Sequence, residues 1–217
     1  MGMGIDSRRI IAKRAAQEVT DGMIVNLGIG IPSLIPEYVA KDVHVMFHAE
    51  NGILGMGPSP GEGKEDSALC NAGGFPITLK EGASYFDSAT AFGMIRGGYI
   101  DLSVLGGLEV SQRGDLANWI VPGKRVPGIG GGMELACKSK KVVVVMSHVD
   151  KGGKPKIVSS CSLPLTAKEC VSKVITDMAV IAVTDKGLCL TEVMDPYTVQ
   201  EVIDQTDAPL FISQHLT

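Results

Sequence analysis

One glutamate stands where a strand of the predicted fold should end. Residues 43–48 form an apolar, β-branched run that favours a buried parallel strand. Glu50 follows this run, and a segment rich in glycine and proline comes after it. In open α/β sheets, ligands bind just beyond the carboxyl ends of the strands. A carboxylate at that position is a candidate nucleophile or general base. From spacing alone, a turn cap or an ion pair with a lysine explains Glu50 equally well.

Two glycine runs could hold an anion close to such a carboxylate. Gly28 and Gly30 follow a predicted strand at 23–27 and lead into a short helix, while residues 128–132 lead into a helix-forming stretch. Backbone N–H groups at such junctions can face an anion. Ser33 occupies the place of the third glycine in a dinucleotide-binding fingerprint, so a carboxylate or thioester is expected there rather than nicotinamide. A flexible linker is the alternative for the second run.

Three asparagines could orient a carboxylate or an acyl group, namely Asn26, Asn51 and, more weakly, Asn118. Asparagine also stabilises turns, so each of them has a second explanation. His44 and His48 have the spacing of two metal ligands on one helix face, but the apolar residues between them favour a strand. We therefore expect structural histidines and no metal site.

The remaining patterns predict alternating strands and helices that would position these groups. One helix, capped by Asp6 or Ser7, extends to residue 18 or 19, and another follows the cap Asp87 and extends to 94 or 95. Residues 55–76 are too broken for regular structure and should form a wall of the site. A last helix begins near Thr198. Strands are expected at 23–27, 43–48, 101–105, 141–146, 156–158, 179–183 and 188–190.

These patterns indicate an α/β fold with an open, mostly parallel sheet and flanking helices, in a single domain over residues 1–217. The formal net charge is −4 with both signs interspersed, so neither nucleic acid nor a membrane is an expected partner. The apolar runs are too short to span a bilayer, and the first residues lack the core of a signal peptide. Five scattered cysteines without a Cys-x-x-Cys pair fit a reducing compartment. We expect a cytoplasmic protein.

The sequence FHAENGILG at residues 47–55 resembles the active-site signature of the family I CoA-transferases, in which a catalytic glutamate precedes Asn-Gly. Further segments resemble, in the same order, the glutamate-bearing half of the succinyl-CoA:3-oxoacid type within that family. They are residues 91–98, 114–119, 128–131 and 162–166, so the similarity covers nearly the whole chain. Two positions depart from the pattern. Ala49 stands where the family usually has serine, and Gly74 where members commonly have a lysine suited to a CoA phosphate.

The resemblance implies the fold that CoA-transferases share with ribose-5-phosphate isomerases, and ping-pong kinetics. Glu50 would attack an acyl-CoA to give an acyl-glutamyl anhydride and then a glutamyl-CoA thioester. A carboxylate such as acetoacetate would take CoA from that thioester. Backbone N–H groups of Gly131 or Gly130 would face the developing oxyanion. No cofactor is implied beyond coenzyme A, which enters as a thioester substrate.

The family has two similar halves, either fused or on separate chains called A and B, and this chain resembles only the glutamate-bearing B half. A CoA-transferase A subunit is therefore the implied partner, in an A2B2 heterotetramer. Other transferases remain open, namely an acetate- or butyrate-type acyl-CoA:acetoacetate enzyme or a component of a lyase-type enzyme. So do a noncatalytic regulatory role and, more remotely, a sugar-phosphate isomerase that uses the carboxylate as a base.

Overall fold

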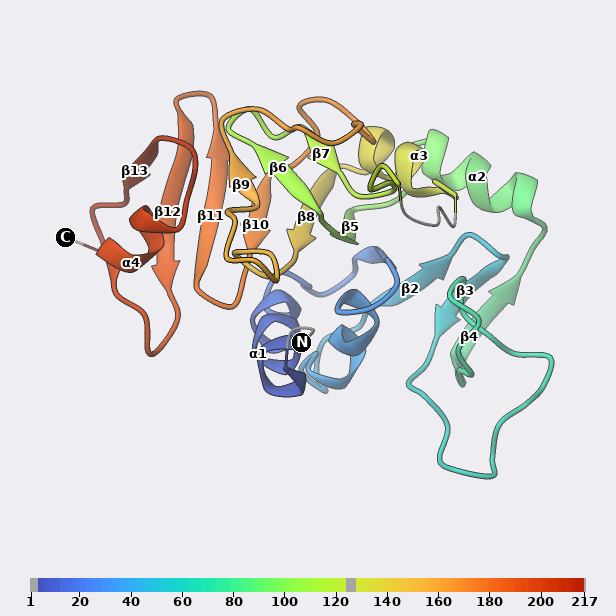
Figure 1. The fold of residues 1–217 in the computed structure, drawn as a ribbon. Helices are drawn as coiled ribbons and strands as arrows, with labels where there is room; N and C mark the ends of the chain where they lie inside the picture. Colours follow the sequence, from blue (N-terminus) through green and yellow to red (C-terminus); the bar gives the residue numbers. More distant parts are fainter. Residues whose placement is uncertain (1–3, 124–127, 217) are drawn as a thin grey trace.

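A ten-stranded sheet forms the centre of the computed structural model, which describes residues 4–123 and 128–216 (Figure 1). Its strand order is β13-β12-β11-β10-β8-β5-β1-β2-β3-β4. The strands are β1 (Ile24–Leu27), β2 (Met46–Ala49), β3 (Ile53–Met56), β4 (Leu79–Tyr85), β5 (Leu102–Gly106), β8 (Lys141–Val145), β10 (Lys173–Ile175), β11 (Ala179–Thr184), β12 (Gly187–Val193) and β13 (Leu210–Ile212). A smaller sheet has the order β7-β6-β9, from β6 (Glu109–Ser111), β7 (Leu116–Ala117) and β9 (Ile157–Val158).

The large sheet is parallel at its centre and antiparallel towards its margins. Strands β2, β1, β5, β8 and β10 are consecutive neighbours and all run parallel. Among the described residues, five neighbouring pairs are parallel and four are antiparallel. The predicted α/β fold with an open, mostly parallel sheet is therefore confirmed, and β3 and β11 run opposite to the central strands.

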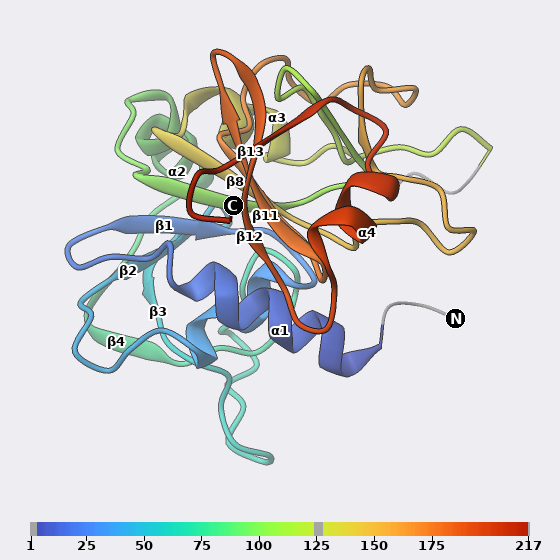
Figure 2. The ribbon, with the colours of Figure 1, turned by 90° about the vertical axis from the view of Figure 1, so that its left-hand side faces the viewer.

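Both faces of the sheet are covered (Figures 1 and 2). Helix α1 (Ile5–Ala16) and the short 3₁₀-helix η1 (Pro32–Glu37) lie on one face, and α2 (Ser88–Arg96), α3 (Gly132–Lys138) and the smaller sheet lie on the other. Side chains of the strands alternate between the two cores, as the period of two requires. Val104 and Val143 pack on the side of α1, whereas Leu105 and Val144 pack on the side of α3. Helix α4 (Val199–Asp204) inserts Val202 into that second core.

Some predicted boundaries and caps are wrong in detail. Helix α1 begins after Gly4 without a side-chain cap, so neither Asp6 nor Ser7 caps it. The Asp87 cap of α2 is confirmed by a bond from the Thr90 N–H, and Thr198 caps α4. Strand β4 is not predicted by the sequence because its side chains are mostly exposed and polar, without the apolar alternation of a half-buried strand. In the described part of the chain, no helix is long and apolar enough to cross a membrane.

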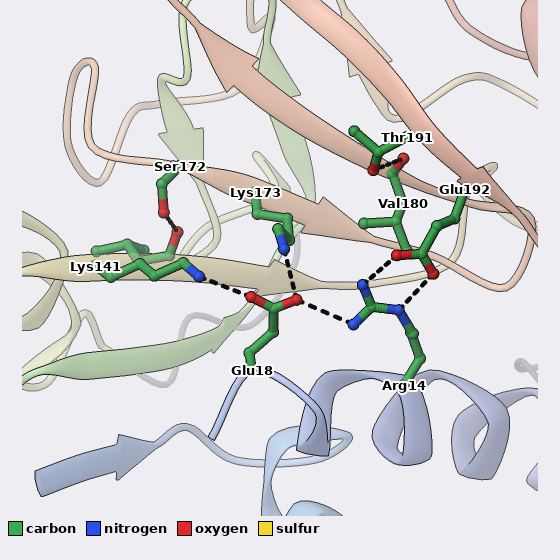
Figure 3. Close-up of polar contacts among 9 residues, drawn as sticks. Arg14, Glu18, Lys141, Ser172, Lys173, Val180, Thr191 and Glu192 are labelled. Carbon is green, nitrogen blue, oxygen red and sulfur yellow. Dashed lines mark hydrogen bonds and ion pairs between the residues drawn. The ribbon is translucent and has the colours of Figure 1, made fainter. Parts of the chain in front are cut away.

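A half-buried cluster of ion pairs around Glu18 fixes the end of α1 to the sheet (Figure 3). The Glu18 carboxylate accepts bonds from Arg14 at 3.0 Å, Lys141 at 2.7 Å and Lys173 at 2.6 Å. Arg14 also donates to Glu192 from its Nε at 2.6 Å. Burial raises the pKa of Glu18, but hydrogen bonds from the two lysines and Arg14 outweigh it and lower the pKa to about 2. The side chain is therefore ionised in the folded protein at every ordinary pH.

Candidate active site

The carboxyl ends of β1, β2 and β5 meet at one edge of the sheet, where the strand order changes direction. The chain passes from β1 to β2 on one side, and later places β5 on the other side of β1. Ligands in open α/β sheets bind at such a switch point. A cleft of about 490 Å³ lies there, and its lining includes Gly28 after β1, Glu50 after β2 and Gly106 at the end of β5.

Glu50 lies in a tight hairpin turn. Strands β2 and β3 are antiparallel, and the Gly52 N–H donates to the Ala49 carbonyl at 3.0 Å. Gly52 has a φ of +115°, and a Cβ there would lie 2.1 Å from the Phe86 carbonyl oxygen. Only glycine fits this position. The sequence predicts an irregular segment directly after Glu50 and no hairpin. In the structure, strand β3 lies between Glu50 and that segment, and the hairpin fixes the direction of the Glu50 side chain.

The Asn26 amide holds one oxygen of the Glu50 carboxylate. Its Nδ2 donates to Glu50 Oε2 at 3.1 Å and to the His48 carbonyl at 3.2 Å. The same nitrogen lies 3.1 Å from Nδ1 of the His48 ring. Asn26 and His48 are direct partners in the β1–β2 ladder, and both are fully buried. Two neighbouring strands therefore present a buried polar cluster that contacts the candidate nucleophile.

Two polar atoms of this cluster, Asn26 Oδ1 and His48 Nε2, find no hydrogen-bond partner in the described structure. A buried group left unpaired costs about 1–3 kcal/mol, so each instance requires an explanation, and a catalytic role is one. Burial lowers the pKa of His48, while the Glu50 charge opposes that shift. The Ala91 backbone also opposes the shift and is the smallest of the three influences on the pKa. His48 is neutral at neutral pH, and its ring stacks on Phe86 with centroids 5.9 Å apart.

The backbone of Gly131, at the start of α3, approaches Glu50 closely. A Cβ on Gly131 would lie 3.4 Å from Cγ of Glu50 and 3.2 Å from two atoms of the Phe92 ring. Its φ of −77° is open to any residue, so close approach rather than backbone conformation favours glycine here. The preceding Gly130 has a φ of +53° and lines the same cleft. The second glycine run therefore borders Glu50 and leads into α3, so it is not a linker, and its role as a backbone anion site stays a prediction.

The segment between β3 and β4 forms part of the wall. It contributes Ala72 to the cleft, and Phe75 to a smaller neighbouring pocket of about 50 Å³. The Asn51 amide donates to the Cys70 carbonyl at 2.8 Å and so ties this segment to the Glu50 turn. The described lining of the cleft is completed by Ile29, Leu105, Gly107, Leu108, Asn118, Trp119, Gly128, Ile129, Gly132 and Leu135.

Most of the predicted site residues come together, but three of them, Gly30, Asn51 and Asn26, do not line the cleft. Gly30 lies outside the lining, and its carbonyl accepts from the Ser33 hydroxyl at 2.8 Å. Asn51 has the turn-stabilising role that was its second explanation. Asn118 lines the cleft, yet its amide donates to the Gly106 carbonyl at 3.0 Å and accepts from the Thr166 hydroxyl at 2.6 Å. Its side chain is therefore engaged within the protein, whereas Asn26 contacts Glu50 directly.

Sequence reasoning missed the position of His48. The signal was available, because residues two apart on a strand share a face, and His48 precedes Glu50 by two. His44 does not join it, since its ring binds the exposed Asp21 at 3.0 Å. In the described ranges no three His, Cys, Asp or Glu side chains are grouped to hold a metal ion. Phe92 and Trp119 were also not singled out, and nothing in their local sequence marks them as site residues.

Known proteins resemble this chain over nearly its whole length. Residues 8–205 match the family model described as coenzyme A transferase. The chain belongs to the coenzyme A transferase family. The beta subunit of a probable coenzyme A transferase of Bacillus subtilis is 57% identical over 212 residues, which cover 98% of each chain. The B subunit of a probable succinyl-CoA:3-ketoacid coenzyme A transferase of the same organism is 52% identical, covering 96% of this transferase and 97% of the relative.

Other relatives differ in the substrate that they are named for. The beta subunit of the acetate CoA-transferase of Escherichia coli K12 is 44% identical, covering 98% of this chain and 97% of its own. Among solved structures, an acyl-CoA transferase (YdiF) of E. coli O157:H7 matches with a TM-score of 0.77 at 22% identity. The match covers all of this transferase but 44% of that chain, so it extends over less than half of the larger protein. It supports the fold alone.

Proposed function

We propose that the chain is the glutamate-bearing subunit of a CoA-transferase that moves CoA from an acyl-CoA to a carboxylate. The observation that carries the proposal is the setting of Glu50. Glu50 lines a cleft, one of its oxygens is held by Asn26, and a Cβ on Gly131 would be in contact with its Cγ. A carboxylate held in place beside backbone amides suits covalent acyl transfer.

The reaction would proceed through covalent glutamyl intermediates. Because Asn26 holds Oε2, we assign the attack on the thioester carbonyl to Oε1 of Glu50. The C–S bond breaks, the thiolate of CoA leaves, and an acyl-glutamyl anhydride remains. The thiolate then attacks the glutamyl carbonyl, releasing the first acid and forming glutamyl-CoA. The acceptor carboxylate reverses both steps. The Gly131 amide would stabilise the oxyanions, and one such donor is worth about 2.7–4 kcal/mol.

Succinyl-CoA as donor and a 3-oxoacid such as acetoacetate as acceptor are the substrates we propose. The support is the 52% identity to a relative named for succinyl-CoA and a 3-ketoacid. An acetate- or butyrate-type transferase is the second candidate, supported by the acetate CoA-transferase relative. Family membership argues against the sugar-phosphate isomerase. The presence of Glu50 in the cleft argues against a noncatalytic role.

We further propose an A subunit as partner, an A2B2 assembly and a cytoplasmic location. The similar chains are named as the B or beta subunits of their enzymes, which supports a partner of a second kind. Free cysteines at all five positions fit a reducing compartment. We expect activity without any added cofactor, because the proposed chemistry needs only the carboxylate, backbone amides and the thioester.

Trapping the covalent intermediate tests this proposal. The chain, co-expressed with its A subunit, is incubated with succinyl-CoA alone and treated with borohydride, which reduces a glutamyl thioester to an alcohol. Mass spectrometry should find the reduced residue at Glu50 and nowhere else. Glu62→Gln, on the exposed β3–β4 segment, serves as a control that retains the adduct. An unmodified Glu50 in a complex that still transfers CoA would contradict the mechanism.

A further inference from the structure

We propose that His48 is a positioning residue for Glu50, acting through the Asn26 amide. The inference rests on the proposed function, and it assigns a role to a buried ring that does not itself touch the cleft. Its basis is the contact geometry on the two neighbouring strands β1 and β2.

The contacts dictate how the Asn26 amide is turned. Three acceptors surround Nδ2, namely Glu50 Oε2, the His48 carbonyl and His48 Nδ1, all within 3.1–3.2 Å. The opposite orientation would set Oδ1 against the Glu50 carboxylate and the His48 carbonyl, oxygen facing oxygen, so Nδ2 is the donor and Nδ1 accepts from it. The amide has two N–H groups, so one reaches Glu50 and the other is left for the two His48 acceptors. His48 thereby supplies two of the three contacts that keep an N–H directed at the nucleophile.

Nδ1 can accept a hydrogen bond only while the ring proton is on Nε2. Nε2 is the ring atom that has no partner in the described structure. The fold therefore leaves the Nε2–H of His48 unpaired and keeps Nδ1 available as an acceptor for the Asn26 amide. Stacking on Phe86, at an interplanar angle of 19°, holds the ring in the orientation that this requires. Phe86 in turn is fixed by its N–H bond to the Gly52 carbonyl at 3.0 Å, so the Glu50 turn and the His48 ring brace each other.

A pair of variants of nearly equal shape isolates the role of Nδ1. His48→Asn keeps an acceptor at the position of Nδ1, because Oδ1 of asparagine is the same number of bonds from the backbone, while His48→Leu has the same branching and no acceptor. Both leave a similar void, so a loss shared by both variants reports packing and a difference between them reports the hydrogen bond. His44→Leu is the matched control, since His44 is exposed and bound to Asp21 outside the cleft.

The variants are assayed in complex with the A subunit, using succinyl-CoA and acetoacetate. We expect His48→Leu to lower kcat about ten- to a hundredfold with little change in KM, as for a misplaced reacting group. His48→Asn should remain within about threefold of the unsubstituted complex. In an Asn26→Ala background, His48→Leu should cause no additional loss, because the group through which it acts is gone.

Three results would overturn the inference: full activity of His48→Leu, equal losses in the Asn and Leu variants, or losses that multiply in the Asn26→Ala background. Should His48→Leu not fold, His48→Phe keeps the stacking ring and again removes the acceptor. The borohydride adduct at Glu50 of the unsubstituted complex is measured in parallel. If the adduct is found, the proposed function stands whatever the His48 variants show. If the adduct is absent, the proposed function is wrong, independently of the His48 variants.

Discussion

Glu18 is buried and Glu50 is half-buried, and their surroundings are opposite. Glu18 is saturated by three cations and has a pKa of about 2, so it is held ionised and inert (Figure 3). Glu50 has one amide contact at one oxygen, and its surroundings leave buried polar atoms unpaired. In this protein a carboxylate serves stability where its hydrogen-bonding capacity is filled, and chemistry where that capacity is left incomplete.

Removing the carboxylate of Glu50 should affect activity, whereas removing that of Glu18 should affect stability. Glu50→Gln should lower kcat by about 10⁴-fold or more, because an amide cannot act as the nucleophile. Its unfolding in urea should be nearly unchanged, since Asn26 can still bond to the amide oxygen. Steady-state transfer assays of the complex and urea titrations measure the two effects. Substantial activity in Glu50→Gln would place the chemistry elsewhere in the cleft.

The turn that carries Glu50 should be far less tolerant than other glycines with positive φ. Gly52→Ala should lower the free energy of unfolding by about 3 kcal/mol or more, through backbone strain and the clash with the Phe86 carbonyl. Gly63→Ala, with a φ of +74° and open space around it, should cost about 1 kcal/mol. Urea titrations compare the two. Equal losses would show that the hairpin does not depend on the close approach.

Glu18→Gln should separate stability from activity in the other direction. It leaves Lys141 and Lys173 without their carboxylate, and a broken buried ion pair costs about 3–5 kcal/mol. Lys141 is 37% exposed, so water offsets part of this, and we expect a loss of about 2 kcal/mol. Glu134→Gln, which breaks the exposed Arg96 pair, is the control and should leave the free energy of unfolding nearly unchanged. Turnover per folded complex should be normal in both variants, and a large loss of turnover in Glu18→Gln would undermine the division of roles.

Much of the sheet could be predicted because its strands are marked locally. The apolar runs at β1, β5 and β8, and the caps at Asp87 and Thr198, are read from neighbouring residues. Strand β4 was missed because its residues are exposed at the sheet margin and lack an apolar pattern. Whether residues 1–217 fold as a single domain stays a prediction.

The candidate site was predicted unevenly for a related reason. Glu50 and the glycine runs stand out in the sequence, whereas the contact of Asn26 with His48 depends on the register between two strands 22 residues apart. The approach of Gly131 to Glu50 spans 81 positions and was expected only through family resemblance. The register between strands and the contacts between residues distant in sequence are set by the whole fold, so no local sequence pattern reveals them.

Adding one methyl group near Glu50 should lower activity with little effect on stability. Gly131→Ala would place a Cβ 3.2 Å from the Phe92 ring, which must yield by a few tenths of an ångström, and 3.4 Å from Glu50 Cγ, in van der Waals contact with the nucleophile. We expect about a tenfold lower kcat with a small change in stability. Gly93→Ala, on α2 and outside the lining of the cleft, meets nothing within 4 Å and should retain activity. Equal activities of the two variants would show that the close approach of Gly131 to Glu50 does not matter for catalysis.

The pH dependence of stability should carry the smallest and most specific signal. The pKa of Glu18 falls from 4.5 to about 2 on folding, so the unfolded chain binds its proton more readily. Stability from this group is therefore present above about pH 4.5 and is lost as pH falls towards 2. Because its lysine partners are partly exposed, we expect about 1–2 kcal/mol of the acid-induced loss to come from Glu18. Urea titrations between pH 5 and pH 3 should show a shallower decline for Glu18→Gln than for the unsubstituted chain. If the free energies of unfolding of the two chains fall in parallel, the ion pairs of Glu18 contribute no more stability than hydration of the separate side chains. The contrast between the two glutamates would then rest on Glu50 alone.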